Sequence, residues 1–393
     1  MNLNLLHTPD GVRDIYGNEL YEKGSVSDSL MDTISSYGYS RIETPTIEFF
    51  DCFSNDIGTI SSKELYKFFD KEGNTLCLRP DFTPSIARCA AKYFKEYDTP
   101  LRFCYKGNTF VNATELQGKL NESTEIGVEL INDSTIEADA ELLCLVIDSL
   151  KALGLKEFLV SVGEINYFKG ICESANLDEE TEMTLRDYIS SKNYFLTGKF
   201  LSDKGIDNGI IKSFEAISKL FMTYDDMYEL MNHCNNERSR NAISHLLKLK
   251  DILSKRGYDK YISFDLSMLS KYHYYTGIIF KAYTNGVGDA IVKGGRYDTL
   301  LEKFGFDAPS VGCVFQVDEL ILALKYQKID IELHKKERIL IYYNSETADA
   351  AYDYAGILRS NGKSVTLVSN SSVPEDKLDK YVADNDFDKV QRL

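Results

Sequence analysis

The chain has 393 residues, 43% of them hydrophobic, and a formal net charge of −16. This length predicts two or three domains, and the composition is typical of globular proteins with sizeable apolar cores. The acidic balance counts against DNA or tRNA as a partner, because nucleic-acid binding needs a basic surface. We find no run of eighteen apolar residues and no signal-peptide pattern, so we expect no membrane association and a cytoplasmic location.

The first half of the chain predicts short strands between three helices. The first helix, Glu19 to Tyr37, is expected to stop at Gly38. Apolar residues at helical spacing predict that the third, 137–153, packs against a core. The other predicted elements are a helix at 83–95 and strands at 39–44, 65–70, 75–78, 102–110, 125–131 and 159–162.

The segment Phe110 to Glu129 predicts two antiparallel strands joined by a long polar loop. The loop offers one cation, Lys119, among Glu115, Glu122 and Glu125. That charge balance repels a triphosphate rather than stabilising it. The segment therefore has the frame of a nucleotide-binding strand pair without the cations that phosphate chemistry needs.

From about Leu177 to Tyr258 the chain is polar and helical in period, which predicts an all-helical insertion. Strands return at 262–265, 277–283 and 290–293, followed by a helix at 318–324. Beyond a charged joint at 335–338, the pattern predicts a β-α-β unit over 339–368. We therefore predict an α+β fold. Its parts are an antiparallel sheet flanked by helices (1–175 and 259–328), a helical insertion (176–258), and a small truncated α/β domain (336–393).

The eight cysteines are scattered, mostly in apolar runs, and form no C-x-x-C pair. In a reducing cytoplasm this distribution predicts buried thiols. We expect neither a zinc site nor any other metal or cofactor.

Five short motifs occur in an order that covers roughly residues 5 to 325. They are HTPDGVRD at 7–14, YGYSRIETP at 37–45, LYKF at 65–68 with LRPDFT at 78–83, YYTG at 274–277, and GGRYD at 294–298. Together they resemble the histidyl-tRNA synthetase family, and within it the non-catalytic regulatory subunits of ATP phosphoribosyltransferase. The resemblance implies the fold of the class II aminoacyl-tRNA synthetases.

Three positions depart from the pattern of the active synthetases. Where the resemblance implies arginines that hold ATP or face the amino-acid pocket, this chain has Val111, Glu319 and Ser270. Charge-assisted contacts to phosphate contribute on the order of a few kcal/mol each, so losing all three should abolish adenylation. We expect no catalytic residues. The segment 338–393 is also shorter than the anticodon-binding domain that a synthetase of this family carries.

The resemblance implies a pocket for free histidine. Asp81 and Glu129 would bind its α-amino group and imidazole, although carboxylates at strand ends are more often solvated surface residues. Thr83 would add a hydroxyl acceptor, and Glu125 stands where the family has glutamine. Successive residues at a strand start point to opposite faces, so one of Tyr274 and Tyr275 should line the pocket and the other pack in the core.

His273 and Arg296, which lie in or beside these motifs, could each have either a structural or a functional role. His273 is either a lid residue or, as for most lone histidines, a structural or exposed one. Arg296 in GGRYD is expected to pair with Asp298 or another core acid.

The function implied by the resemblance is regulation of the short-form ATP phosphoribosyltransferase catalytic subunit, with free histidine as effector. A homodimer formed through about residues 19–45 would join the catalytic subunit in a hetero-octamer. One alternative is an active histidyl-tRNA synthetase or a related aminoacyl-adenylate-forming enzyme. Another is a histidine-binding module with a different partner.

Overall fold

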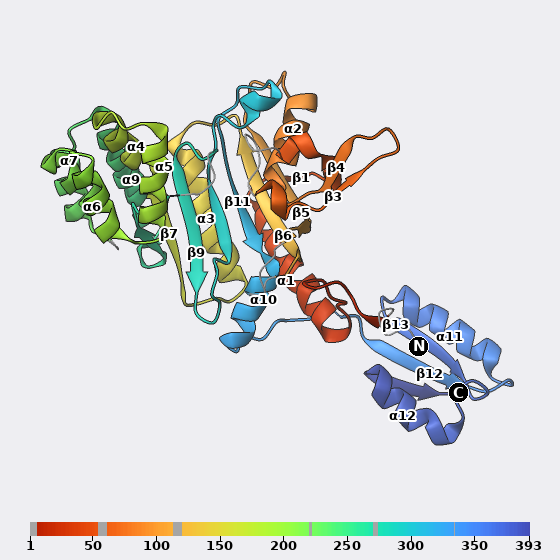
Figure 1. Ribbon diagram of the computed structural model, residues 1–393. Helices are drawn as coiled ribbons and strands as arrows, with labels where there is room; N and C mark the ends of the chain where they lie inside the picture. The colour runs from red at the N-terminus through yellow and green to blue at the C-terminus, as the bar shows by residue number, and fades with distance from the viewer. Residues whose placement is uncertain (1–5, 54–60, 113–119, 220–221, 270–273, 334) are drawn as a thin grey trace. The chain divides into compact units, whose positions relative to one another are not determined.

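The computed structural model describes residues 6–53, 61–112, 120–219, 222–269, 274–333 and 335–393. The chain divides into two compact units, Met1–Ile331 and Glu332–Leu393. The first holds the large sheet and most of the helices (Figure 1). Among the described residues, none of the helices combines the length and apolar character needed to cross a bilayer.

An eight-stranded sheet of order β1-β5-β6-β11-β10-β9-β7-β8 forms the centre of the first unit. The pairs β1·β5 and β7·β8 at its edges are parallel, and the pairs between them are antiparallel. The strands are β1 (Ser40–Arg41), β5 (Leu101–Phe110), β6 (Glu122–Ile131), β7 (Phe158–Glu164), β8 (Ile262–Phe264), β9 (Ile278–Thr284), β10 (Val292–Arg296) and β11 (Ser310–Gln316). This mixed sheet flanked by helices is the α+β fold that the sequence predicts.

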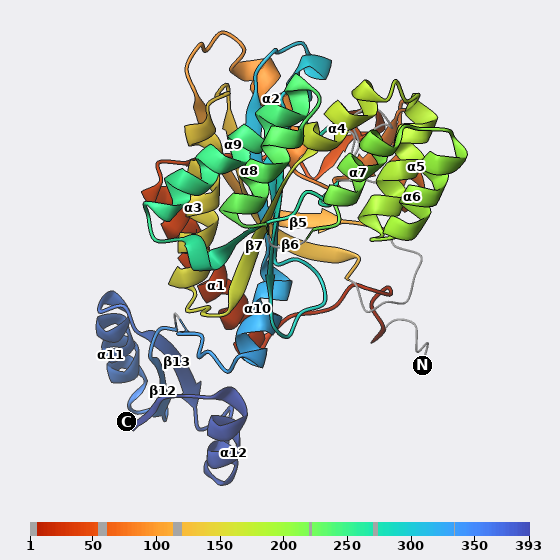
Figure 2. The same cartoon turned by 90° about the vertical axis from the view of Figure 1, so that its left-hand side faces the viewer.

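Helices cover one face of this sheet. Figures 1 and 2 show α3 (Ile136–Ala152) along it, packed between α1 (Gly17–Ser36) and α9 (Glu237–Ser254). The predicted apolar face of α3 is confirmed, because Leu142, Leu145, Val146 and Leu150 are completely buried. Gly38 follows α1 with a left-handed φ of 82°, as its predicted role as a stop requires. A short helix, α10 (Val317–Tyr326), packs against α1 and β6.

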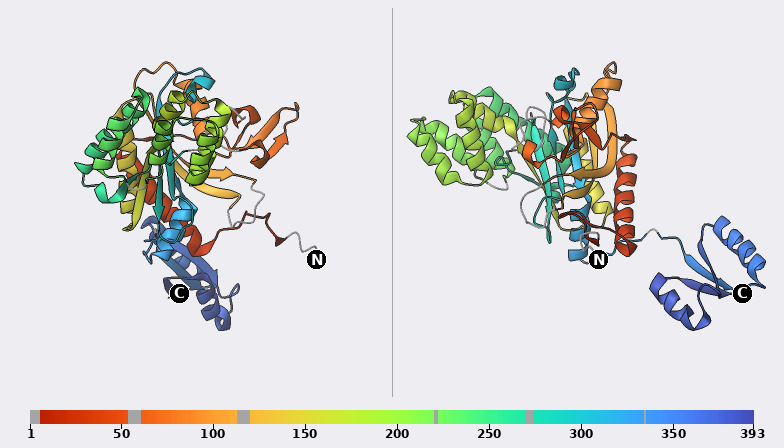
Figure 3. Two further views of the ribbon diagram at one scale, coloured as in Figure 1. Left: turned by 60° about the vertical axis from the view of Figure 1, so that its left-hand side comes forward. Right: turned by 45° about the vertical axis from the view of Figure 1, so that its right-hand side comes forward.

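The segment between β7 and β8 is helical, as the sequence predicts (Figure 3). Each of its last five helices is capped by a polar side chain that accepts a backbone N–H, and such caps fix where helices begin. The helices are α4 (Ile165–Ser174), α5 (Glu179–Ser190), α6 (Tyr194–Asp203), α7 (Asn208–Ala216), α8 (Tyr224–His233) and α9. Their buried apolar residues share one core with the large sheet, so a separate insertion domain at 176–258 stays a prediction.

A small sheet of order β2-β4-β3 and helix α2 (Thr83–Tyr93) complete the first unit. Its strands are β2 (Ile47–Phe49), β3 (Lys67–Phe69) and β4 (Thr75–Leu78). The predicted pair of strands around residues 72–74 is confirmed.

The second unit, shown in blue in Figure 3, has a three-stranded parallel sheet of order β13-β12-β14. Alternate residues of β12 (Arg338–Tyr343) face opposite sides: Ile339 and Ile341 pack against α11 (Ala348–Ser360), and Leu340 and Tyr342 against α12 (Glu375–Asn385). The predicted β-α-β unit ends at β13 (Ser364–Ser369), and the sequence did not predict β14 (Lys389–Arg392).

The prediction of buried thiols is confirmed: every cysteine is free, and only Cys89 is not fully buried. A larger error concerns β11, which we did not predict although it lies between β6 and β10 near the middle of the sheet. Its sequence, SVGCVFQ, is short and contains a glycine that weakens the strand signal.

Candidate functional site

Glu129 is the most deeply buried of the predicted site residues, with 1% of its surface exposed. The Thr83 hydroxyl at the start of α2 donates to its Oε1 at 2.8 Å, and the Tyr297 hydroxyl donates to Oε2. Thr83 is thus a donor to Glu129, and its own backbone N–H donates to Asp81 Oδ1 at 3.0 Å. The structure brings Asp81, Thr83 and Glu129 together at the junction of α2 and β6.

The room for the Glu129 carboxyl comes from a glycine on the neighbouring strand. Gly312 of β11 lies directly opposite Glu129 in the sheet. A Cβ at position 312 would lie 1.7 Å from Glu129 Oε2, so no other residue fits without displacing the carboxyl.

Glu125 lies four residues before Glu129 on β6, and therefore on the same face of the sheet. The Gln316 side chain, opposite it on β11, donates to Glu125 Oε1 at 3.0 Å. Burial, together with the nearby Asp81 charge, raises the pKa of Glu125 to about 7. Burial likewise raises the pKa of Glu129 to about 8, although hydrogen bonds from Tyr297 and Thr83 oppose the shift. Both carboxyls would ionise more readily beside a cation.

The two tyrosines of the YYTG motif do not lie on opposite faces, so that prediction is wrong. β9 begins only at Ile278, and Tyr274 and Tyr275 precede it in a turn where strand alternation does not hold. Their ring centroids are 4.5 Å apart, and both side chains line one cavity.

That cavity, of about 590 Å³, lies beside the buried carboxyls, and Asp81, Glu125, Tyr274 and Tyr275 line it. Two positions that depart from the synthetase pattern, Val111 and Glu319, line it as well. Its volume is that of a small-molecule site. Thr83 and Glu129 are not among its lining residues and lie behind Asp81.

Every lysine and arginine that lines the described part of this cavity has an acidic partner. Arg13 pairs with Glu19 at 2.6 Å, Lys23 with Asp318 at 2.9 Å, Lys293 with Asp289 at 3.2 Å, and Lys325 with Glu22 at 2.6 Å. Asp318 also accepts the backbone N–H of Thr124 at 2.9 Å, which fixes it in the wall. Cations paired in this way offer little attraction to a polyphosphate.

Several predicted features fall outside the described residues. They are Lys119 and Glu115 of the loop after β5, the departure at Ser270, and His273. Their interpretations stay predictions.

The expectation for Arg296 is confirmed. Its guanidinium donates to Asp139 Oδ1 from Nε at 2.9 Å and from Nη2 at 2.6 Å, and to Asp298 Oδ1 at 3.1 Å. Asp139 also contacts His245 Nε2 at 3.1 Å, and the other imidazole nitrogen lies 3.2 Å from Glu164 Oε2. Arg296 is thus part of a buried ion network.

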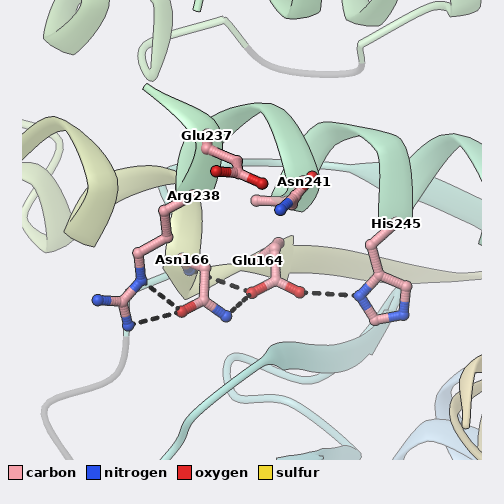
Figure 4. Close-up of a pocket in the computed structure, with 7 residues that line it drawn as sticks. Glu164, Asn166, Glu237, Arg238, Asn241 and His245 are labelled. Carbon is pink, nitrogen blue, oxygen red and sulfur yellow. Dashed lines mark hydrogen bonds and ion pairs between the residues drawn. The ribbon is translucent and has the colours of Figure 1, made fainter. Parts of the chain in front are cut away.

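Figure 4 shows the outer end of this network, where residues of α9 face Glu164 and Asn166. A second cavity, of about 610 Å³, opens here. The Asn166 side chain donates to Glu164 Oε1 and to the Thr276 carbonyl, both at 2.8 Å, and accepts from Arg238 Nη2 at 2.8 Å. These contacts hold α9, α4 and the segment before β9 together, which favours a structural role for the cluster.

Three residues of the site were not predicted from the sequence: Tyr297, Gln316 and Gly312. Tyr297 stands in the GGRYD motif, so its proximity to the pocket could have been inferred. Gln316 and Gly312 both lie on β11, and without that strand nothing placed them opposite Glu125 and Glu129.

The family model described as histidyl-tRNA synthetase matches residues 11–320. The structure also resembles histidyl-tRNA synthetase from Nostoc sp. PCC 7120, with a TM-score of 0.79 over 97% of this chain and 90% of that one. At 18% identity this likeness shows the fold alone.

Relatives with higher sequence identity show to which group within this family the chain belongs. The chain is 36% identical over 386 residues to ATP phosphoribosyltransferase regulatory subunits from Clostridium novyi (strain NT) and Thermoanaerobacter pseudethanolicus. The alignments cover 98% of this chain, and 91% and 99% of those relatives. A Bacillus halodurans structure described as an ATP phosphoribosyltransferase regulatory subunit/histidyl-tRNA synthetase superimposes with a TM-score of 0.88 at 30% identity, covering 99% of this chain and 98% of that one. The chain belongs to the histidyl-tRNA synthetase family, among the ATP phosphoribosyltransferase regulatory subunits.

Proposed function

We propose that this chain is a non-catalytic subunit that activates a short-form ATP phosphoribosyltransferase and makes it sensitive to free histidine. The names of the relatives support the regulatory role and imply a catalytic partner. Histidine binding can change the activity of an assembly without chemistry, if its affinity differs between two states of that assembly. A coupling of about 1–3 kcal/mol is enough.

One observation carries the proposal: Asp81 and Glu125 line a cavity whose described cations are all paired with acids, and the buried Glu129 lies next to them on the same face of β6 as Glu125. Such a cavity favours a small ligand with cationic or N–H groups, such as the ammonium and imidazole of histidine. It disfavours a nucleoside triphosphate, whose negative charge would meet Glu125, Glu319 and Asp318.

The absence of adenylation chemistry is the first prediction to test. Val111 and Glu319 line the cavity where the synthetase pattern has arginines, and Ser270 is the third such position. We expect no histidine-dependent exchange of pyrophosphate into ATP above the background without protein. Exchange above background would overturn the proposal and favour the alternative of a histidyl-tRNA synthetase or a related adenylate-forming enzyme.

The second prediction concerns histidine itself. We expect calorimetry to show weak binding to the isolated chain and tighter binding in complex with the catalytic subunit. Glu129→Ala should reduce affinity at least about tenfold, because a hydrogen bond to a charged group contributes about 1.5–3 kcal/mol. Glu122→Ala is the matched control: it also lies on β6, but its side chain bonds Asn108 at 2.7 Å on the other face.

If the complex is inhibited by histidine equally well when Asp81 and Glu129 are both neutralised, the effector site lies elsewhere.

The proposed assembly is a hetero-octamer in which this chain forms homodimers and the catalytic subunit is the partner. We place this assembly in the cytoplasm and expect it to bind no nucleic acid. Co-purification with equal amounts of the two chains would support it.

A further inference from the structure

A row of polar side chains crosses the edge of the large sheet, at some remove from the carboxyl pair. Ser263 on β8, Ser161 on β7 and Lys281 on β9 are direct neighbours in the strand register, and so share one face. Adjacent strands lie about 4.8 Å apart, so the two serine side chains and the base of the Lys281 side chain lie side by side, and all three residues line one cavity. The serine hydroxyls bond one another at 3.0 Å, and this leaves one of their two O–H groups free to donate elsewhere.

Lys281 forms no ion pair with any residue that the structure describes, although it is largely shielded from water. Asp265, which lines the same cavity, and Asp289, whose charge acts on Lys281, are already engaged: Asp265 Oδ2 pairs with Lys192 at 3.0 Å, and Asp289 with Lys293 at 3.2 Å. Burial, together with the neighbouring charge of Lys293, lowers the pKa of Lys281. An ammonium in such surroundings gains most from an added anion.

The row forms the floor of a third cavity, of about 340 Å³. Apolar side chains of Met268 and Leu269, from the segment after β8, and the ring of Tyr283 line part of its wall, and Asp265 and Ser267 line it as well. The end of α5 contributes Ser190, whose hydroxyl donates to the Leu269 carbonyl at 3.1 Å, and the following Lys192. The cavity therefore lies where the helical segment meets the sheet edge.

We propose that this cavity binds a small organic acid, with one carboxylate on Lys281 and the Ser161–Ser263 hydroxyl pair and its apolar body against Met268, Leu269 and Tyr283. The charges select a monoanion: Lys192 and Lys281 are positive, Asp265 is negative, and the net charge is one positive. A phosphate dianion would leave one charge uncompensated and approach Asp265 closely. The site shares no lining residue with the cavity beside Glu125.

The test uses the full chain with ¹³C-dimethylated lysines, whose charge is retained, titrated with sodium benzoate at constant ionic strength. The Lys281 signal is identified by its absence in Lys281→Met. We expect it to shift saturably on titration and its pH midpoint to rise. Ser161→Ala should weaken binding about threefold to tenfold through loss of a hydroxyl donor.

The control is Lys248, an exposed lysine on α9 whose signal, assigned with Lys248→Met, reports unspecific ionic contact. If Lys281 moves only linearly and as little as Lys248, no site exists. If inorganic phosphate saturates the Lys281 signal more tightly than benzoate, a binding site for carboxylate monoanions is the wrong assignment. Saturation by benzoate, weakened in Ser161→Ala and absent at Lys248, supports it.

Discussion

Keeping the Glu129 carboxyl buried lowers folding stability near neutral pH, and a bound cation could offset this loss. The pKa of a glutamate is ordinarily about 4.5, and burial raises that of Glu129 to about 8. Between these two pH values the unfolded chain has lost the proton while the folded chain keeps it, so folding stability falls as pH rises through this window. A bound ammonium or imidazole N–H beside the carboxyl would favour its ionised form.

This gives a prediction on proton linkage. Histidine binding at pH 7 should release protons from the folded chain, because the ligand lowers the pKa of Glu129 and of Glu125. Calorimetric enthalpies measured in buffers of different ionisation enthalpy report the number released. Glu129→Gln should release fewer protons than the wild type, and an unchanged number in this variant would mean that histidine does not contact Glu129.

Glu125 and Glu129 were proposed as site residues from the family resemblance, and the structure places them four apart on one strand and therefore on one face of the sheet. Tyr274 and Tyr275 were misplaced because strand alternation was extended into a turn. The Thr83–Glu129 bond joins residues 46 apart, and no local pattern encodes such a contact.

At the scale of elements, long amphipathic helices were predictable and the central strand β11 was not. α3 buries apolar residues at helical spacing over most of its length, whereas β11 has seven residues, a glycine and no polar alternation. A strand buried on both faces has no alternating pattern. Because β11 supplies Gly312 and Gln316, the residues opposite Glu129 and Glu125 were not predicted either.

Helix α9 is joined to the core by the ion network that His245 makes with Asp139 and Glu164. Burial lowers the pKa of the imidazole, but hydrogen bonds and charge from the two acids outweigh it and raise the pKa to about 9. The ordinary value is 6.5, so the stabilisation is fully present below that pH and is lost as pH rises through about 9.

We therefore expect His245→Gln to destabilise the chain by about 2 kcal/mol at pH 6. This is less than the roughly 3–5 kcal/mol for breaking a fully buried pair, because 26% of the His245 side chain is exposed. The wild type should lose more stability than the variant between pH 6.5 and 9, measured by urea unfolding. Asn241→Ala, an exposed change one turn earlier on α9, is the control and should have almost no effect. Parallel pH profiles for wild type and His245→Gln would contradict the network.

At the scale of the whole molecule, one apolar face of the small sheet is partly exposed in the described chain. In the small sheet, Phe49, Leu76 and Phe68 lie opposite one another, and Ile47 faces Leu78, so all five share a face. Ile47 and Phe49 are 50% and 59% exposed, whereas Cys77 on the other face is completely buried. Strand β2, which carries Ile47 and Phe49 of this face, comes directly after residues 19–45 in the sequence. Residues 19–45 are the predicted homodimer interface. An exposed apolar face of this kind favours burial against a second copy.

The last prediction follows from that face. The chain should be a dimer in light scattering at micromolar concentration, and Phe49→Asp should convert it to a monomer because a buried, unpaired carboxylate at an apolar interface is costly. Phe69→Asp is the matched control: Phe69 is 74% exposed on the same small sheet, but its register with Thr75 places it on the opposite face from Phe49. A monomeric wild type would refute the dimer. Loss of the dimer in both variants would show that the interface does not select this face, and an unaffected Phe49→Asp dimer would place the contact away from it.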